Sequence, residues 1–406
     1  MSAPAQTLGQ SARIIGLVAA AHGLSHFYQI AVAVLFPLIR DDLGVSYVAL
    51  GATVALYYTV SGVCQTLAGF AADRFGARRV LFAGLLLGAA GALMAGLARD
   101  YAMLVAAAIV GGLGNSVFHP CDFAILNARV EARRLGYAFS WHGVAGFLGY
   151  AAAPAYAMAT AAAFEWRGAL VGAAVVGLAA TGVLWSQRDS LYVAPADRVR
   201  RAGEGGLGAD LRVLVSAPVL MCFGYFVLIA IAFVAMQNFG VATLAMHFGA
   251  STALASTALT AYLLGGAAGI FAGGFLAARA ARHDLVAVAG MAASALFMLA
   301  LALAWVPAAA LPAWLGAAGF ASGLTNPSRD LIVRASTPPG ATGKVYGFVY
   351  SGLDVGSMAT PVFFGWLLDT GLSGAVFYSV VAAQALTIAM VLNLPARRTE
   401  AVTRGS

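Results

Sequence analysis

Twelve apolar segments, each long enough to cross a lipid bilayer, limit what this chain can fold into more than any other feature of its sequence. A helix needs about 20 apolar residues to span the hydrocarbon core. Charged residues make up only 10% of the 406 residues, whereas soluble domains carry roughly 25%. Backbone exposed to lipid must satisfy its own hydrogen bonds, so the segments are predicted to be helices. The predicted spans are 14–38, 47–72, 79–98, 101–128, 136–163, 166–186, 217–243, 252–278, 285–305, 309–335, 343–368 and 373–394.

The basic residues are concentrated in loops that would share one side of the membrane. If the N-terminus is cytoplasmic, the outer loops hold only three of them, Arg40, Arg99 and Arg167. Positive residues accumulate in the cytoplasmic loops of membrane proteins, so both termini are predicted to be cytoplasmic. The formal net charge of +7 follows from this topology, and we expect no nucleic-acid partner.

The two halves of the chain repeat each other at an offset of 205 to 207 residues. The matching positions include Pro120 and Pro327, Pro154 and Pro361, and Gly44 and Gly249. Duplicated halves with a site at their interface are typical of transporters. We therefore predict an all-α integral membrane protein with two six-helix bundles related by a pseudo-twofold axis. The bundles are residues 1–186 and 217–406, joined by a polar cytoplasmic linker at 187–216.

A short loop between the second and third predicted spans combines glycines, one acid and clustered arginines. The positions concerned are Gly69, Asp73, Arg74, Gly76, Arg78 and Arg79. This pattern resembles the loop signature of the major facilitator superfamily of membrane transporters. The resemblance implies two bundles that rock about a central cavity, with the first, fourth, seventh and tenth spans lining it. It also implies that these six residues control the conformational change.

A second resemblance lies in the fourth predicted span. The run Gly-Leu-Gly-Asn-Ser-Val-Phe-His-Pro at 112–120 is similar to the equivalent helix of fosmidomycin-resistance-type and related bacterial transporters. The fifth span keeps part of a signature of drug/proton antiporters, in Gly143, Gly146, Gly149 and Pro154, but lacks its Gly-Pro pair. Drug efflux is therefore an alternative and not the first prediction.

Ionisable or strongly polar side chains are few inside the predicted spans. Each is a functional candidate, because a charge at the centre of a bilayer costs at least about 2.5 kcal/mol. In the first span, His22, His26 and Gln29 follow an i, i+4, i+7 spacing and share one helix face. A histidine inside a span can also be a packing residue. The candidates for substrate binding and proton coupling are His26, Gln29, Asn115, His119, Asp122, His142, Asn326, Arg329 and Asp354.

Asp122 and Arg329 occupy equivalent positions in the two halves, 207 residues apart. A pseudo-twofold axis would direct both side chains toward that axis. They could pair when the cavity closes on the cytoplasmic side, or Arg329 could hold an anion while Asp122 takes a proton. A permanent salt bridge between two helices is the structural alternative. The neighbouring Asp330 is expected to neutralise Arg334, one turn further along the helix.

Potential metal ligands also occur, in His22, His26, His119, Cys121, Met236, Met246 and His247. Copper(I) favours thiolate and thioether sulfur, whereas imidazole suits several metals. The His-x-x-x-Met or Met-x-x-x-Met spacing that would favour copper is missing from the seventh and eighth spans. We predict no resident metal or cofactor, and we keep copper import as an alternative. No set of nucleophile, base and orienting residue is recognisable, so we predict no enzyme and no catalytic residue.

The sequence thus predicts a multi-pass protein of the inner (cytoplasmic) membrane that works as a monomer. Its predicted function is proton-coupled secondary transport of a small organic solute by alternating access, since the spans carry histidines and aspartates and the sequence has no nucleotide-binding motif. Arg329 favours an anion such as a carboxylate or a phosphonate. The alternatives are efflux of a drug-like compound, copper import, and a non-transporting membrane receptor or accessory protein.

Overall fold

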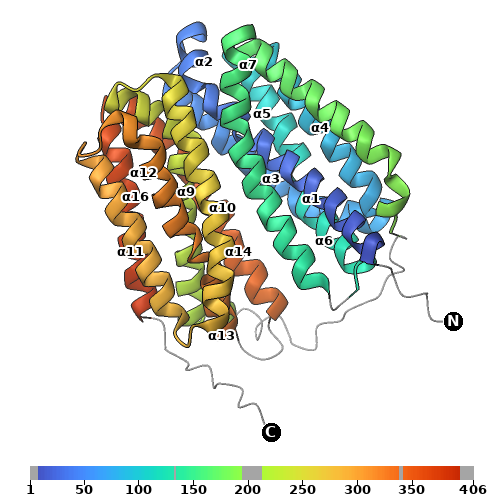
Figure 1. Ribbon diagram of the computed structural model, residues 1–406. Helices are drawn as coiled ribbons and strands as arrows, with labels where there is room; N and C mark the ends of the chain where they lie inside the picture. Colours follow the sequence, from blue (N-terminus) through green and yellow to red (C-terminus); the bar gives the residue numbers. More distant parts are fainter. Residues whose placement is uncertain (1–7, 132–133, 194–212, 338–341, 394–406) are drawn as a thin grey trace, which may run out of the picture. The chain divides into compact units, whose positions relative to one another are not determined.

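The computed structural model describes residues 8–131, 134–193, 213–337 and 342–393, and helices dominate these stretches (Figure 1). The chain divides into two compact units. Unit 1 comprises residues 1–200 together with Pro361–Asp369, and unit 2 comprises residues 201–360 together with 370–406. Most of the predicted linker, residues 194–212, lies outside the described residues.

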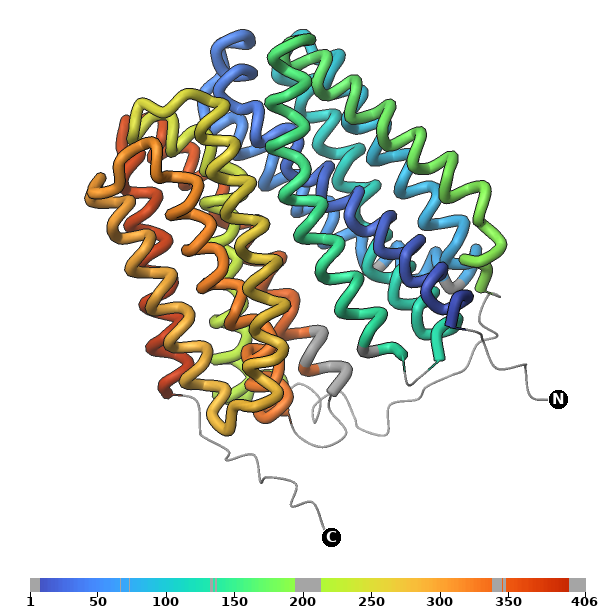
Figure 2. Tube along the Cα trace, viewed as in Figure 1, coloured from blue at the N-terminus to red at the C-terminus, as the bar shows by residue number. Residues whose placement is uncertain are grey.

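Unit 1 is built from helices that pack against one another. Its helices are α1 (Leu8–Ala31), η1 (Ala33–Leu35), α2 (Phe36–Leu43), α3 (Tyr47–Phe75), α4 (Ala77–Gly96), α5 (Tyr101–Asn115), α6 (Phe118–Arg129), α7 (Leu135–Ser186), η3 (Arg188–Leu191) and α15 (Pro361–Asp369). Figure 2 traces α1 beside the first part of α7, and these two helices share one of the most extensive contacts in the unit.

Unit 2 repeats this plan with helices from the second half of the chain. Its helices are α9 (Ala217–Phe248), α10 (Thr252–Arg279), α11 (His283–Ala302), η4 (Ala308–Ala310), α12 (Leu311–Gly323), α13 (Asn326–Ser336), α14 (Thr342–Ala359) and α16 (Ser373–Asn393). The buried core includes Tyr225 and Phe226 of α9, Val333 of α13 and Val349 of α14.

Ten helical stretches of the described residues are long and apolar enough to cross a membrane. One of them, Tyr137–Ser186, covers two of the predicted spans. Its backbone leaves the helical conformation at Phe164 and Glu165, where Glu165 has a φ of 58°. The predicted span 343–368 is divided into α14 and α15, because the residue before Pro361 is disfavoured in the α conformation.

The sequence repeat recurs as a repeat of local structure. Gly44 and Gly249, which follow α2 and α9, have φ values of 63° and 61°, a left-handed conformation that favours glycine. Ser46 and Ser251 then begin the next helix, and each side chain accepts a hydrogen bond from the backbone N–H three residues on. The same helix end and the same N-cap therefore occur at matching positions of both halves.

Close packing of α1 on α7 positions the polar residues of unit 1. A Cβ atom added at Gly149 would lie 1.9 Å from the backbone oxygen of Gly23, so the two helices touch at their backbones. On another side of α1, an apolar core holds α4 and α6 through residues such as Leu81, Leu85 and Ile125. Helices α1, α6 and α7 therefore meet in one compact region.

Helix α15 packs against α3 in unit 1, although the sequence predicts that its residues belong to the second bundle. Glycines allow this contact. A Cβ at Gly51 would lie 2.3 Å from the backbone oxygen of Pro361, and one at Gly365 would lie 2.3 Å from that of Tyr47. Unit 1 thus includes a short helix that comes from the far end of the sequence.

Candidate functional site

Helices α1, α6 and α7 bring three histidines and one aspartate together inside unit 1. His22 comes from α1, His119 and Asp122 come from the first turns of α6, and His142 comes from α7. A break at residues 116 and 117 separates α5 from α6, and Pro120 lies in the first turn of α6, where proline is tolerated. We call these four residues the histidine–aspartate cluster.

Asp122 is the centre of the histidine–aspartate cluster, and its side chain is completely buried. Its Oδ2 atom lies 3.1 Å from Nε2 of His142, in a hydrogen bond. The same oxygen lies 3.1 Å from Nδ1 of His22, close enough for an ion pair but without hydrogen-bond alignment. The rings of His22 and His142 stack with their centroids 3.5 Å apart.

Some polar atoms of this region have no hydrogen-bond partner among the described residues. They are Oδ1 of Asp122 and the Nδ1 atoms of His22 and His26. Buried polar atoms are paired in the great majority of cases, and a buried carboxylate is costly unless it is paired. The cluster is therefore polar, buried and incompletely satisfied, which is typical of a site that binds a proton or another cation.

A second polar network extends from the cluster across four helices of unit 1. The hydroxyl of Tyr150 donates to Oε1 of Gln29 over 2.5 Å, and Nε2 of Gln29 donates to Oδ1 of Asn115 over 2.9 Å. Nδ2 of Asn115 then donates to the hydroxyl of Ser61 over 2.8 Å. The ring centroid of His26 lies 4.2 Å from that of Tyr150 and 4.4 Å from that of His22. His26 therefore connects the two groups.

Gly146 of α7 makes room for the imidazole rings. A Cβ atom at this position would lie 2.6 Å from Cε1 of His26 and 3.3 Å from Cδ2 of His22. Real Cβ atoms do not approach another atom as closely as 2.6 Å. Any side chain at position 146 would therefore displace the histidines of α1.

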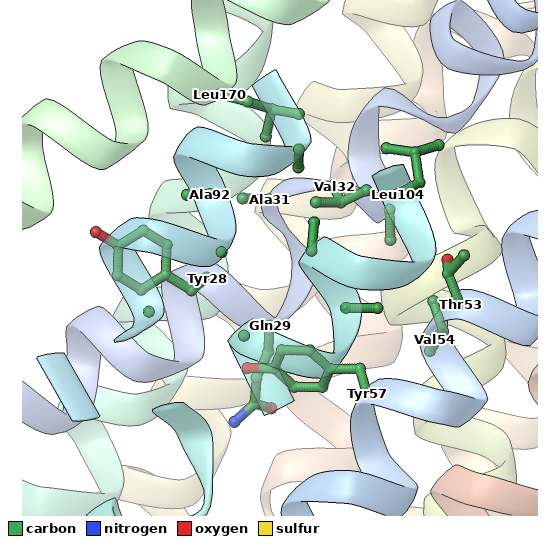
Figure 3. A pocket seen from close by; sticks show the side chains of 17 residues that line it. Tyr28, Gln29, Ala31, Val32, Thr53, Val54, Tyr57, Ala92, Leu104 and Leu170 are labelled. Carbon is green, nitrogen blue, oxygen red and sulfur yellow. The ribbon is translucent and has the colours of Figure 1, made fainter. Parts of the chain in front are cut away.

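A cavity of ≈60 Å³ lies beside Gln29, between α1, α3, α4 and α5 (Figure 3). Its polar lining includes Tyr28, Gln29, Thr53 and Tyr57, and the rest of the lining is mainly apolar. A water molecule needs roughly 10–15 Å³ of cavity volume, so this cavity has room for about four water molecules. Gln29 is shared between the cavity and the hydrogen-bonded network.

In unit 2, Arg329 of α13 is held by neighbours on its own and other helices. Its Nε atom lies 3.0 Å from Oδ1 of Asp330, and one terminal nitrogen lies 3.3 Å from Oδ1 of Asn326. The guanidinium stands 4.7 Å from the ring centroid of Phe226. The hydroxyl of Tyr350 donates to the same Asp330 oxygen over 3.0 Å. Asp330 therefore pairs with Arg329, its neighbour in the sequence, and the predicted neutralisation of Arg334 stays a prediction.

Asp354, on α14, differs from the other candidates. Its side chain is half-buried, and it makes no hydrogen bond or ion pair with the part of the chain that the structure describes.

The predicted gating loop forms the junction between α3 and α4. Gly76 ends α3 with a φ of 90°, and a Cβ at Gly69 would touch the side chain of Pro120 at 3.9 Å. Arg78 binds the backbone oxygen of Arg188 and the carboxylate of Asp189, at 3.3 and 3.1 Å. The loop is thus fastened to η3.

The remaining loop residues are less informative. Arg74 and Arg79 are exposed, and the side chain of Asp73 lies outside the described part of the structure. The part that the resemblance assigns to Asp73 in the conformational change therefore stays a prediction.

Three residues that contact the predicted site residues are not themselves predicted from the sequence: His22, Tyr150 and Phe226. His22 is not among the predicted site residues. It lies one turn before His26 on the same face of α1, and this i, i+4 spacing is the sequence signal that could have included it. Tyr150 and Phe226 carry no sequence signal that distinguishes them from the many other aromatic residues of the spans. Their roles depend on contacts between helices that are far apart in sequence.

Two units of apolar helices with buried ionisable groups define a multi-pass membrane protein, and comparison with known proteins identifies its family. The chain belongs to the Major Facilitator Superfamily, whose family model matches residues 17–246 and 221–405. This confirms the resemblance predicted from the Gly69–Arg79 loop. Relatives of this chain by sequence are named as transporters, among them a probable sulfoacetate transporter of Cupriavidus necator, 25% identical over 165 residues that cover 41% of this chain and 38% of the relative.

Individual relatives agree with this family. The chain is 26% identical over 140 residues to the probable L-galactonate transporter of Escherichia coli (strain K12), a match that covers 34% of this chain and 31% of the relative. It is 24% identical over 107 residues to the fosmidomycin resistance protein of the same organism, covering 26% of each. The matched stretches thus span a third or less of these relatives.

The fold has a close counterpart among solved structures. A bacterial homolog of the human lysosomal transporter Spinster, in an inward-facing and unoccupied conformation, superposes with a TM-score of 0.70. The superposition covers 96% of this chain and 95% of the other, at 14% sequence identity. At this identity the likeness establishes the fold alone.

Proposed function

We propose that this protein is a proton-coupled secondary transporter that moves a small organic anion across the cytoplasmic membrane by alternating access. In this proposal the chain crosses the membrane twelve times as a monomer, with both termini in the cytoplasm. Its partners are the substrate, protons and lipid, and no nucleic acid. The observation that carries the proposal is the completely buried Asp122 carboxylate between two imidazoles.

Proton coupling needs a group that can change its charge inside the membrane. A carboxylate inside a membrane is costly, and the hydrogen bond with His142 together with the nearby Nδ1 of His22 reduces the cost. If each ring carries its proton on the nitrogen that faces Asp122, His22 and His142 both present that proton to one oxygen. A proton that binds Asp122 would neutralise its carboxylate, which would then no longer require His22 and His142 as stabilising neighbours. This change in local interactions is the kind of event that can shift the balance between two conformations.

Arg329 supports an anionic substrate. A guanidinium binds carboxylate or phosphonate oxygens with paired, geometrically specific hydrogen bonds. Among the described residues, the carboxylate that pairs with Arg329 is that of Asp330, whose side chain is 42% exposed. A substrate carboxylate could therefore replace Asp330 as a partner of Arg329. The galactonate named for one relative is a carboxylate, which agrees with this class.

Efflux of a drug-like compound is the second candidate. It is favoured by the similarity to a fosmidomycin resistance protein and by the glycines of α7, which bring that helix against α1. Copper import and a non-transporting receptor have less support. The histidine–aspartate cluster offers nitrogen and oxygen ligands, whereas copper(I) prefers sulfur, and a receptor does not require buried ionisable groups.

The test is transport by the purified protein reconstituted into liposomes. Uptake would be followed for galactonate, other carboxylates, phosphonates and cationic drugs, each with and without an imposed pH gradient. We expect a carboxylate or phosphonate to be accumulated only when the gradient is present. Accumulation of cationic drugs alone would replace the first proposal by the second.

The Asp122→Asn variant separates proton coupling from substrate movement. It should abolish accumulation driven by the pH gradient while keeping the exchange of labelled for unlabelled substrate, because exchange needs no net proton movement. Asp41→Asn is the matched control, since Asp41 is an exposed acid of the same unit. Gradient-driven accumulation that is unchanged in Asp122→Asn would show that coupling occurs elsewhere.

A further inference from the structure

The histidine–aspartate cluster has the ligands and spacing of a metal centre, which the sequence does not predict. One ligand nitrogen from each of His22, His119 and His142 lies within 4.8 Å of the other two. Oδ2 of Asp122 lies 3.1 Å from Nδ1 of His22 and 3.1 Å from Nε2 of His142. Three imidazoles and one carboxylate therefore converge on a single volume.

These spacings can be compared with those of a tetrahedral site. With metal–ligand distances of 2.0–2.1 Å for zinc, neighbouring ligand atoms are about 3.3 Å apart. The two oxygen–nitrogen separations of 3.1 Å already match this value. The three histidine nitrogens lie within 4.8 Å of one another, and the rings of His22 and His142 are stacked with their centroids 3.5 Å apart, so the rings must shift before all three nitrogens can reach one ion. The site is thus close to, but not fixed in, the bound geometry.

The unpaired atoms of the cluster point to the same conclusion. Nδ1 of His22 and Oδ1 of Asp122 are buried without a hydrogen-bond partner among the described residues. Buried polar atoms in native structures are nearly always paired with protein, water or an ion. A cation placed among the four ligands would satisfy the nitrogen directly. His119 is exposed at the surface of the unit whereas His22 and His142 are buried, so an ion could reach the site at His119.

We propose that His22, His119, His142 and Asp122 form a binding site for one divalent transition metal ion of the zinc class. Imidazole and carboxylate ligands suit Zn²⁺, Ni²⁺ and Cu²⁺, whereas copper(I) selects sulfur and Mg²⁺ or Ca²⁺ selects oxygen. The single carboxylate balances half of the charge of the ion. This proposal depends on the geometry of unit 1 alone, and it holds whether or not the transported substrate is an anion.

Cobalt(II) is the probe for the first test, because it replaces zinc and absorbs visible light strongly in tetrahedral sites. The purified full-length protein in detergent would be titrated with Co²⁺, and Zn²⁺ would then be added as a competitor. We expect one equivalent of Co²⁺ to bind with the strong tetrahedral absorption, and Zn²⁺ to displace it. A folded wild-type protein that binds no Co²⁺ and no Zn²⁺ would overturn the proposal.

Two substitutions and two controls then locate the ion. His119→Gln and His142→Gln should weaken binding by more than about 100-fold, the upper end of the effect of losing an outer-shell partner. His247→Gln is the control in unit 2, where His247 contacts the backbone oxygen of Leu301. His283→Gln, on α11 of the same unit, is the second control. Unchanged affinity in both cluster variants, or loss of binding in His247→Gln, would refute the assignment.

A measurement on the wild-type protein keeps the proposal testable if the cluster variants do not fold. X-ray absorption at the zinc edge should show a first shell of nitrogen and oxygen at about 2.0–2.1 Å, with the outer-shell scattering of about three imidazoles. A first shell that contains sulfur, or only one imidazole, would place the ion elsewhere. Transport assays play no part in either measurement, so failure of this proposal leaves the proposed transport function untouched.

Discussion

Asp369, the last residue of α15, accepts hydrogen bonds from the backbone N–H groups of Tyr47 and Val48 at the start of α3, over 2.8 and 2.7 Å. Ser46 accepts the next free N–H of α3, that of Ala49. The first N–H groups of a helix have no partner within the helix, and a negative charge there is also favoured by the helix dipole. A residue from the second half of the chain thus completes the N-cap of a helix in the first half.

Removal of this carboxylate should loosen the attachment of α15. Asp369→Ala is expected to lower the stability of unit 1 by about 1 kcal/mol, the typical effect of losing a helix cap. Thermal unfolding of the detergent-solubilised protein measures the change, and limited proteolysis should cut more readily near residue 370. Ser46→Ala, which removes a cap from the same helix end, is the control for a purely local effect. If Asp369→Ala unfolds like the wild type and is cut no faster, the contact does not hold α15 in place.

Gly146 offers a second, more selective test of the site. In Gly146→Ala the new methyl group would meet Cε1 of His26 at 2.6 Å and Nδ1 at 2.7 Å. Overpacking of this kind costs about 1–3 kcal/mol, and it should push His26 away from Gly146. Melting temperature and transport should therefore both fall.

The same helix provides the matched control for Gly146→Ala. Gly143 lies about one turn earlier on α7, and a Cβ atom there meets nothing within 4 Å. Gly143→Ala should therefore be neutral or slightly stabilising, because alanine is favoured over glycine inside a helix. Equal behaviour of the two variants would contradict the role assigned to Gly146.

The hydrogen bond from Tyr150 to Gln29 can be tested by a double-mutant cycle. Tyr150→Phe removes the donor and leaves Oε1 of Gln29 without it, at a cost of about 1–3 kcal/mol for a buried polar group. In the background Gln29→Leu no acceptor remains, so the same change should cost much less. The free energies of the four proteins, measured by thermal or denaturant unfolding, give the coupling. A coupling of zero would show that the two side chains do not depend on each other.

The sequence predicts the family and the all-helical fold class, because both depend on local patterns. Apolar runs mark the membrane spans, and the glycine and arginine signature marks the superfamily that the comparison confirms. Positions of helix breaks were predicted less well. The helical backbone is interrupted at Phe164 and Glu165, and another break precedes Pro361. Both lie inside or next to apolar runs, so hydropathy alone does not mark them.

The sequence selects individual residues of this region but does not predict which of them are in contact. Gln29 and Asn115 were both proposed and are hydrogen-bonded to each other, and His119, Asp122 and His142 fall in one cluster. The repeat indicated a relationship between Asp122 and Arg329, but each has partners in its own unit, His142 and Asp330. Internal symmetry gives equivalent positions, whereas partners depend on which helices pack together, and that information is not local in the sequence.

Substitution of Arg329 should separate charge from hydrogen-bond geometry in substrate recognition. Arg329→Lys keeps the positive charge but loses the planar guanidinium that can bind two oxygens at once, whereas Arg329→Gln loses the charge as well. Hydrogen bonds to charged groups contribute about 1.5–3 kcal/mol. Arg329→Gln should therefore weaken anion binding by roughly 10- to 100-fold. The affinity of Arg329→Lys should lie between that of Arg329→Gln and that of the wild type. Ligand-induced stabilisation in a thermal-shift titration provides the affinities. Arg334→Gln is the control, because Arg334 lies exposed on the same helix and should bind like the wild type. If Arg329→Lys and Arg329→Gln both keep the affinity of the wild type, as the control does, Arg329 serves only to pair with Asp330. The anion must then bind at another position.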